Sequence, residues 1–231
     1  MDLDRVDAGA GVLGAVLGFV GSSLVFSTLP REDDPVEKYL SFVVDKRGQI
    51  LAGVVMFAIS TGLLLWWANA LRHRLATAGD RALPDLVLAA AVLALGCTFV
   101  GLMPVAALAW RGPAGLDGNV VRLLVDMLSV LFAVLSAVPF FLLAFAASLS
   151  MLRTRMFPAW AAWLGMVAAV VNGIFVFSLF AKKGLLSPYS PVGFLGAVLF
   201  FVWVAASGVL MLQGDERVAA VGASTAQPAV P

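Results

Sequence analysis

The chain has 231 residues, of which 61% are hydrophobic and 13% are charged, and its mean hydropathy is +0.99. Soluble domains carry about 25% charged residues, so this apolar excess predicts surfaces that face lipid rather than a soluble core. The net charge of +1, without a basic block, excludes a nucleic-acid partner. One cysteine, Cys97, and one histidine, His73, exclude an internal disulfide, a cysteine-based metal site and a haem held by two histidines. We therefore expect no cofactor and no metal site.

Six apolar runs, each about 20 residues or longer, predict six membrane-crossing helices. The expected fold is all-α: a six-helix transmembrane bundle in a single membrane domain over residues 1–213, followed by a disordered tail over 214–231. The residues before the first run are acidic, and no small-x-small cleavage site follows it, so we interpret the run as a span rather than a signal peptide. The expected spans are 8–29, 50–71, 85–110, 120–150, 158–180 and 192–213.

Small residues recur every four positions along the first run, at Ala10, Gly14, Gly18 and Ser22. This spacing places them on one helix face, where they let two backbones approach closely in lipid. Tight packing within the chain is the first interpretation, and a face for a second copy is the alternative.

The loop over residues 30–49 is the longest and most polar, and it predicts a short amphipathic helix. Asp34 is placed to cap this helix, and Gly48 is placed to end it. Its apolar face is expected to contain Val36, Tyr39, Leu40, Val43 and Val44. The alternatives are a structural lid and a loop that gates a ligand or binds a partner.

Two features of the next spans are typical of membrane helices. Trp66 and Trp67 lie near the end of the second span, where tryptophans usually anchor a helix at the bilayer surface. Pro104 lies near the far end of the third span and is expected to bend or end that helix.

The fourth span carries an acid, Asp126, which makes it the main candidate for function because ionisable groups are costly inside a membrane. Arg122 precedes it by one helical turn, the spacing at which side chains meet. Asp126 also lies only about 9 Å from the expected start of the helix at 1.5 Å per residue. The alternatives are an ion pair with Arg122 at the membrane surface and a cavity carboxylate for a cation, a proton or a polar substrate.

Two further residues complete the set of candidate functional polar positions. Pro139 is expected to kink the fourth span near its middle and to free the carbonyl of Leu135. Asn172 lies at mid-depth in the fifth span, where a hydrogen bond to a neighbouring helix is expected and a role in substrate binding is the alternative.

The orientation follows from two similar basic turns. The second span ends in Leu71-Arg72-His73-Arg74 and the fourth in Leu152-Arg153-Thr154-Arg155, each followed by a proline that opens the next span. Basic short loops are normally cytoplasmic, which predicts a protein of the cell membrane with both termini inside. The total number of lysines and arginines is nearly equal on the two sides, so this prediction depends on the two turns.

Three segments, VEKYLSFVVDKRGQILAG, LLLWWANALRHRL and LRTRMFPAWAAWLGMVAAVVNG, carry a family resemblance. The chain resembles a widespread group of six-span actinobacterial membrane proteins of unknown function, over about residues 8–213. The resemblance implies a helical membrane bundle and transfers no catalytic residue.

The sequence contains no GxSxG, HExxH, paired-aspartate or phosphate-loop motif that would indicate an enzyme. Three hypotheses remain: a non-enzymatic protein that acts by structure or by interaction with a membrane partner or a second copy; a small transporter that uses Asp126, Pro139 and Asn172 around a polar cavity; and an enzyme that acts on lipid, for which at least two convergent carboxylates are required.

Overall fold

The computed structural model describes residues 3–27, 29–31, 34–180 and 191–225, and their side chains apart from those of 3–5, 133, 191–193 and 214–225. These ranges are helical and contain no strand, which confirms the predicted all-α class. The elements are α1 (Leu3–Phe26), α2 (Val36–Asp45), α3 (Arg47–Thr77), α4 (Pro84–Arg111), α5 (Gly118–Leu128), the π-helical segment η1 (Ser129–Leu135), α6 (Ala137–Thr154), α7 (Ala159–Phe175), the 3-10 segment η2 (Val176–Phe180) and α8 (Pro191–Thr225).

Six helical stretches in the described residues are long and apolar enough to cross a membrane. They coincide with the six predicted spans, and the fourth consists of α5, η1 and α6 in succession. In each stretch, between 33% and 47% of an 18-residue apolar window is buried inside the bundle, and the rest is half-buried or exposed.

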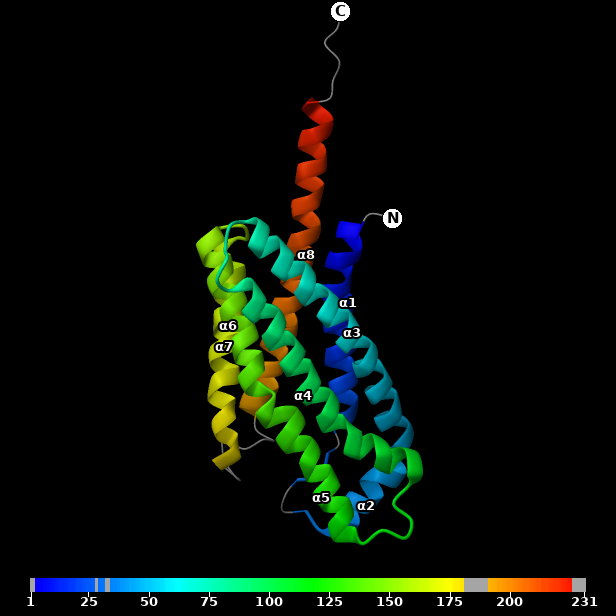
Figure 1. Cartoon of the computed structure of the whole chain (residues 1–231). Helices are drawn as coiled ribbons and strands as arrows, with labels where there is room; N and C mark the ends of the chain where they lie inside the picture. The colour runs from blue at the N-terminus through cyan, green and yellow to red at the C-terminus, as the bar shows by residue number, and fades with distance from the viewer. Residues whose placement is uncertain (1–2, 28, 32–33, 181–190, 226–231) are drawn as a thin grey trace, which may run out of the picture.

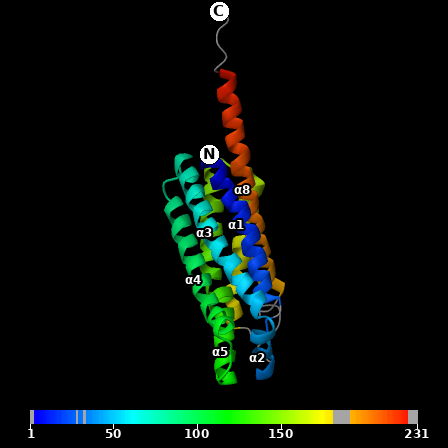
Figure 2. The same ribbon diagram turned by 90° about the vertical axis from the view of Figure 1, so that its right-hand side faces the viewer.

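The six long stretches form a closed ring (Figures 1 and 2). Each packs against the next along the chain, in the order α1, α3, α4, α6, α7 and α8, and α8 returns to pack against α1. Both ends of the chain lie at one end of the ring, together with the α3–α4 and α6–α7 turns, while α2 and α5 lie at the other (Figure 1). Two buried apolar clusters, one toward each end, hold this ring together.

The small face of α1 packs inside the chain. A Cβ atom on Gly18 would lie 2.6 Å from Ser60 Oγ of α3, and a Cβ atom on Gly21 would lie 2.9 Å from the carbonyl oxygen of Gly53. The Ser60 hydroxyl donates a 2.7 Å hydrogen bond to the carbonyl of Gly14. Gly14 and Gly18 of the predicted face therefore pack against α3 within the chain, as the first interpretation expected.

The two neighbouring tryptophans of α3 have different environments. Trp66 is 50% exposed, as expected of a surface anchor, and its Nε1–H donates to Asp7 Oδ1 at 2.6 Å. Trp67 is only 1% exposed, donates to Ser207 Oγ at 3.2 Å and packs edge-to-face on Trp203 with ring centroids 5.5 Å apart. The prediction of a surface anchor was therefore wrong for Trp67, because adjacent helical residues point about 100° apart and only one of them faces the lipid side.

The predicted amphipathic helix is present as α2, with three corrections. Asp34 does not cap the helix; its carboxylate accepts from the Arg31 amide at 2.6 Å and from Lys38 Nζ at 2.8 Å. Gly48 does not end it, because α3 already begins at Arg47. The buried face consists of Tyr39, Phe42 and Val43, whereas Val44 is 57% exposed.

Two helix ends also differ from expectation. Pro104 does not end its helix, because α4 continues through it to Arg111. At that end, Arg47 Nε donates to the carbonyl of Ala109 at 2.8 Å and so satisfies one of the terminal carbonyls. Helix α8 continues to Thr225 and includes part of the predicted disordered tail. Extending a formed helix requires no new nucleus, and no proline interrupts the tail before Pro228.

Candidate functional site

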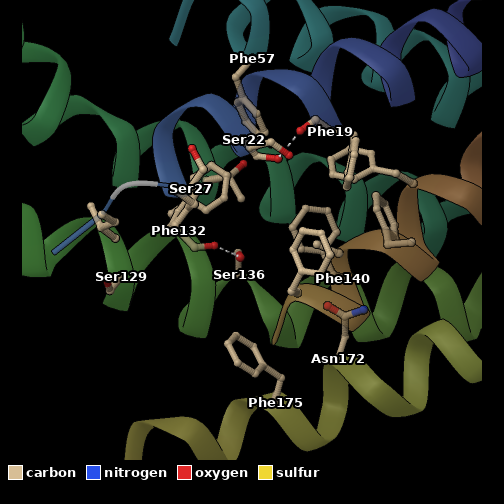
Figure 3. Close-up of a pocket in the computed structure, with 18 of the residues that line it drawn as sticks. Phe19, Ser22, Ser27, Phe57, Ser129, Phe132, Ser136, Phe140, Asn172 and Phe175 are labelled. Carbon is tan, nitrogen blue, oxygen red and sulfur yellow. Dashed lines mark hydrogen bonds between the residues drawn. The ribbon is translucent and has the colours of Figure 1, made fainter. Parts of the chain in front are cut away.

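A cavity of about 420 Å³ lies inside the ring of helices (Figure 3). Its walls come from α1, α3, α4, η1, α6, α7 and α8, and it extends to the chain segment that leads from α1 to α2. This volume is within the range of about 300–1,000 Å³ that is typical of small-molecule sites. The lining residues are Phe19, Ser22, Ser23, Phe26, Ser27, Leu29, Arg31, Phe57, Thr98, Ser129, Phe132, Ser136, Phe140, Asn172, Phe175, Phe194, Ala197, Phe200 and Phe201.

Phenylalanine rings from different helices form most of the wall. Phe132 of η1 lies between two of them, with ring centroids 4.8 Å from Phe26 and 5.0 Å from Phe57. On the other side, Phe140 and Phe200 have centroids 4.6 Å apart. Such pairs stabilise the packing by about 0.5–1.5 kcal/mol beyond their buried area. These ring contacts therefore connect helices that are distant in the sequence, and the rings form the wall of the cavity.

Asn172 contributes a buried amide to this wall. Its side chain is 8% exposed, and its Nδ2 group donates to the carbonyls of Ala168 at 2.8 Å and of Gly196 at 3.3 Å. The second bond crosses from α7 to α8 and matches the predicted contact between helices. The same residue also lines the cavity, so one amide serves both packing and the site.

The π-helical segment η1 forms another part of the wall. It carries Ser129 and Phe132, and Ser136 directly after it donates a hydrogen bond to the carbonyl of Phe132. On its outer side, a Cβ atom on Gly101 of α4 would lie only 2.6 Å from the Phe132 nitrogen, so only glycine permits this approach. This helical irregularity comes just before Pro139, the position of the predicted kink, and Pro139 itself lies in the first turn of α6. Single π-helical turns are frequent at functional sites.

At the end of the cavity near α2, a small polar cluster surrounds Tyr39. The buried Tyr39 hydroxyl lies 2.9 Å from the Arg31 carbonyl and 3.3 Å from Asp126 Oδ1. Because a phenol has one proton, it donates fully to only one of these acceptors at a time. The Arg122 guanidinium lies over the Tyr39 ring at 5.6 Å, and its Nε is 3.9 Å from Asp126 Oδ2.

The predicted candidate residues are therefore divided between two places. Asn172 lines the cavity, whereas Pro139 is buried beside it without being part of the lining. Asp126 and Arg122 meet each other and Tyr39 at the α2 end, with side chains 34% and 35% exposed. Asp126 does not line the cavity. Its carboxylate contacts the Tyr39 hydroxyl, which also contacts the carbonyl of Arg31, a residue of the lining.

The phenylalanine and serine residues of the wall were not predicted as site residues, and Ser22 was predicted only as part of a packing face. A signal for them exists in α1, where Phe19, Ser22, Ser23 and Phe26 follow helical spacing on one face. The same alternation occurs at Ser129, Phe132 and Ser136. In a chain this apolar, such residues were overlooked because neither type is costly to place in lipid.

A second polar cluster lies at the opposite end of the ring, around Asp80. Its Oδ1 accepts from the Ala82 amide at 2.9 Å and from the Leu83 amide at 3.4 Å, which fixes the turn into α4. The Ser150 hydroxyl of α6 faces the carboxylate without completing a hydrogen bond of good geometry. This hydroxyl, the two amides and the Arg153 charge outweigh desolvation and hold the pKa of Asp80 below its ordinary value of 3.8.

No family model, no curated protein and no solved structure matches this chain. The features of the structure that bear on function are the cavity and the two polar clusters.

Proposed function

We propose that this chain is a multi-pass membrane protein that binds a small, mainly apolar molecule in the cavity of its helical ring. The observation that supports this function is the cavity itself: about 420 Å³, walled by phenylalanine rings and a few polar groups. Binding sites for small molecules have this composition, in which apolar walls provide affinity and a few polar groups fix the orientation.

Binding is favoured over catalysis by the chemistry of the wall. Among the described lining residues, none is an acid, a histidine, a cysteine or a lysine that could transfer a proton or act as a nucleophile at neutral pH. The enzyme hypothesis required at least two carboxylates that converge on one groove, and the described lining supplies none. The non-enzymatic hypothesis is therefore the one that the site supports.

A cavity-filling substitution tests the proposal. Ala197 lines the cavity, so Ala197→Phe should occupy part of it, whereas Ala58→Phe adds the same ring to an exposed position of α3. The purified protein in nanodiscs is titrated with the fluorescent probe N-phenyl-1-naphthylamine, and empty nanodiscs correct for partition into lipid. We expect Ala197→Phe to weaken saturable probe binding at least about tenfold, a loss of about 1.4 kcal/mol, and Ala58→Phe to leave it unchanged.

If the wild-type protein shows no saturable binding, or if both variants bind as the wild type does, the cavity is not a binding site. The remaining hypothesis is then an interaction role, with a membrane-protein partner or a second copy of the chain.

Carriage of the ligand across the membrane is a second candidate, favoured by the π-helical segment in the wall. A change of η1 from π to α geometry would shift its register and move Phe132, which now packs between α1 and α3. Counterflow of a labelled ligand into proteoliposomes distinguishes a carrier from a protein that only binds. Retention of bound ligand without exchange would contradict the carrier.

We further propose that the end with both termini faces the cytoplasm of a cell membrane. The support is the grouping of basic turns at that end, including Arg72, Arg74 and Arg153. In a Cys97→Ser background, Ala78→Cys and Ala114→Cys place single thiols at exposed positions of opposite ends. In intact cells, an impermeant maleimide should label Ala114→Cys and spare Ala78→Cys; the reverse pattern would invert the orientation.

A further inference from the structure

Three hydroxyl groups of the cavity wall already donate their protons to backbone carbonyls. Ser22 Oγ donates to the carbonyl of Phe19 at 3.0 Å, and Ser136 Oγ donates to the carbonyl of Phe132. Thr98 Oγ1 lies 2.9 Å from the Leu95 carbonyl and 3.1 Å from the Ala94 carbonyl and shares its proton between them. A hydroxyl has one proton and two lone pairs, so these three groups retain only acceptor capacity toward a ligand.

The donor groups of Asn172 are also already engaged in hydrogen bonds to the backbone. Both N–H bonds of its Nδ2 group are directed at backbone carbonyls, those of Ala168 and Gly196. Carbonyls cannot donate, so the amide cannot turn its oxygen toward them without losing both bonds. The atom of the amide that remains for a ligand is therefore Oδ1, again an acceptor, on a residue that is only 8% exposed.

The aromatic wall has the same electrostatic preference. The faces of phenylalanine rings are electronegative, and they attract cations and polarised hydrogens rather than anions. The described lining contains one cationic residue, Arg31, at the exposed end of the cavity. Arg31 is a neighbour of Asp34, whose pKa is lowered chiefly by the hydrogen bond from Lys38 and further by the Arg31 amide and charge. Ser22, Thr98, Ser136, Asn172 and the ring faces thus offer acceptors to a ligand, and the one cationic residue of the described lining lies at the mouth of the cavity.

We infer that the cavity selects its ligand by hydrogen-bond donors, and that the class it fits best is an apolar organic ammonium ion, a primary or secondary amine on an aromatic or alkyl body. This inference depends on the proposed binding function. A protonated amine supplies two or three donors to Ser22, Thr98, Ser136 and Asn172, and its charge is stabilised by ring faces. A carboxylate would bring only acceptors to Ser22, Thr98, Ser136 and Asn172, whose O–H and N–H groups already donate to backbone carbonyls.

The test is a matched series of naphthalene compounds that differ in one functional group. These are 2-(1-naphthyl)ethylamine, its N,N,N-trimethyl ammonium analogue, 2-(1-naphthyl)ethanol and 1-naphthylacetate. Each displaces N-phenyl-1-naphthylamine from the intact protein in nanodiscs of uncharged phosphatidylcholine. We expect the primary amine to displace the probe at a concentration at least about tenfold lower than the trimethyl analogue and the carboxylate, with the alcohol between them.

The outcomes separate this inference from the function on which it depends. Equal displacement by all four compounds, or strongest displacement by the carboxylate, would overturn donor selection and leave the binding cavity intact. Equal displacement by the amine and its trimethyl analogue would overturn it as well, because charge without donors would then be sufficient. Absence of saturable probe binding would overturn the proposed function itself.

A pair of isosteric variants tests the role of the acceptors in the same assay. Thr98→Val removes an acceptor of the cavity, whereas Thr61→Val removes a similar threonine hydroxyl that donates to its own helix at Phe57 and does not line the cavity. We expect the preference for the primary amine over its trimethyl analogue to fall at least about threefold in Thr98→Val and to remain in Thr61→Val. An unchanged preference in both variants would overturn the assignment of Thr98 to the site.

Discussion

Tyr39 of α2 and Asp126 of α5 are 87 residues apart in the chain, yet the phenol oxygen and a carboxylate oxygen lie 3.3 Å from each other. The same hydroxyl lies 2.9 Å from the Arg31 carbonyl. One side chain of α2 therefore contacts both the segment between α1 and α2 and helix α5. Asp126, the acid that draws attention in the sequence, is therefore part of the contact that holds α2 over one end of the ring.

Removing the Tyr39 hydroxyl should loosen that contact. Tyr39→Phe keeps the buried ring and removes the hydroxyl. The Arg31 carbonyl and the Asp126 carboxylate then lose the hydrogen bond that this hydroxyl donates. We expect the free energy of unfolding to fall by about 1–2 kcal/mol, measured by thermal melting in detergent. Ser41→Ala, which removes an exposed hydroxyl of the same helix, is the control and should have little effect. Equal stability of the two variants would contradict the role of Tyr39.

The pair of Asp126 and Arg122 should contribute little by itself. Its nitrogen–oxygen distance is 3.9 Å and both side chains are about one-third exposed, conditions under which an ion pair is worth about 0–1 kcal/mol. A double-mutant cycle of Asp126→Asn and Arg122→Ala measures the coupling, which we expect below about 0.5 kcal/mol. If Asp126→Asn instead abolishes ligand carriage in proteoliposomes while stability is unchanged, Asp126 belongs to a transport pathway.

Asp80 should make stability depend on pH in the acid range. Its pKa in the folded protein is below 3.8, the ordinary value, chiefly because of Ser150. A depressed folded pKa contributes stability that is complete above the unfolded pKa and is lost as pH falls through the folded pKa. We expect Asp80→Asn to lower the melting temperature at pH 6 and to reduce the loss of stability between pH 5 and about pH 3. Glu37→Gln, at an exposed position of α2, is the control. A pH profile of Asp80→Asn parallel to that of the wild type would contradict this prediction.

Gly101 should be required where α4 meets the π-helical segment. A Cβ atom there would lie 2.6 Å from the Phe132 nitrogen, and backbone atoms cannot move aside as a flexible side chain can. We expect Gly101→Ala to cost about 1–3 kcal/mol of stability and to weaken probe binding. Gly96→Ala in the same helix meets nothing within 4 Å and should be neutral or slightly stabilising. Equal melting temperatures for the two variants would show that η1 shifts freely.

The two adjacent tryptophans of α3 provide another matched comparison. Trp67→Phe removes a buried donor to Ser207 and reshapes the contact with Trp203, so we expect a loss of about 1–3 kcal/mol. Trp66→Phe removes only an exposed bond to Asp7 and should cost less than about 1 kcal/mol. Thermal melting of both variants checks the difference; a larger loss in Trp66→Phe would contradict the burial assigned to Trp67.

The long apolar runs could be predicted from the sequence because their signal is local. Twenty or more consecutive apolar residues specify a helix long enough to span a bilayer whatever its neighbours are, and the six runs reappear as six long helical stretches. The amphipathic helix after the first run was predicted for the same reason, since Tyr39 and Val43 repeat at helical spacing. The predicted cap of this helix by Asp34 was wrong, because the Asp34 carboxylate binds Lys38 instead.

The candidate site depended on the tertiary structure. Nothing in the local sequence distinguishes Trp66 from Trp67 or shows that Phe132 lies between α1 and α3, because these differences arise from which helices become neighbours. The closed ring brings Ser22, Thr98, Ser136 and Asn172 around one cavity from four separate runs. The sequence alone determined the six long apolar stretches and the amphipathic helix, through the hydrophobic effect along the chain, but not the π-helical segment inside the fourth stretch. The packing between helices determined the cavity, because close approach at glycines such as Gly21, Gly53 and Gly101 sets which side chains face inward.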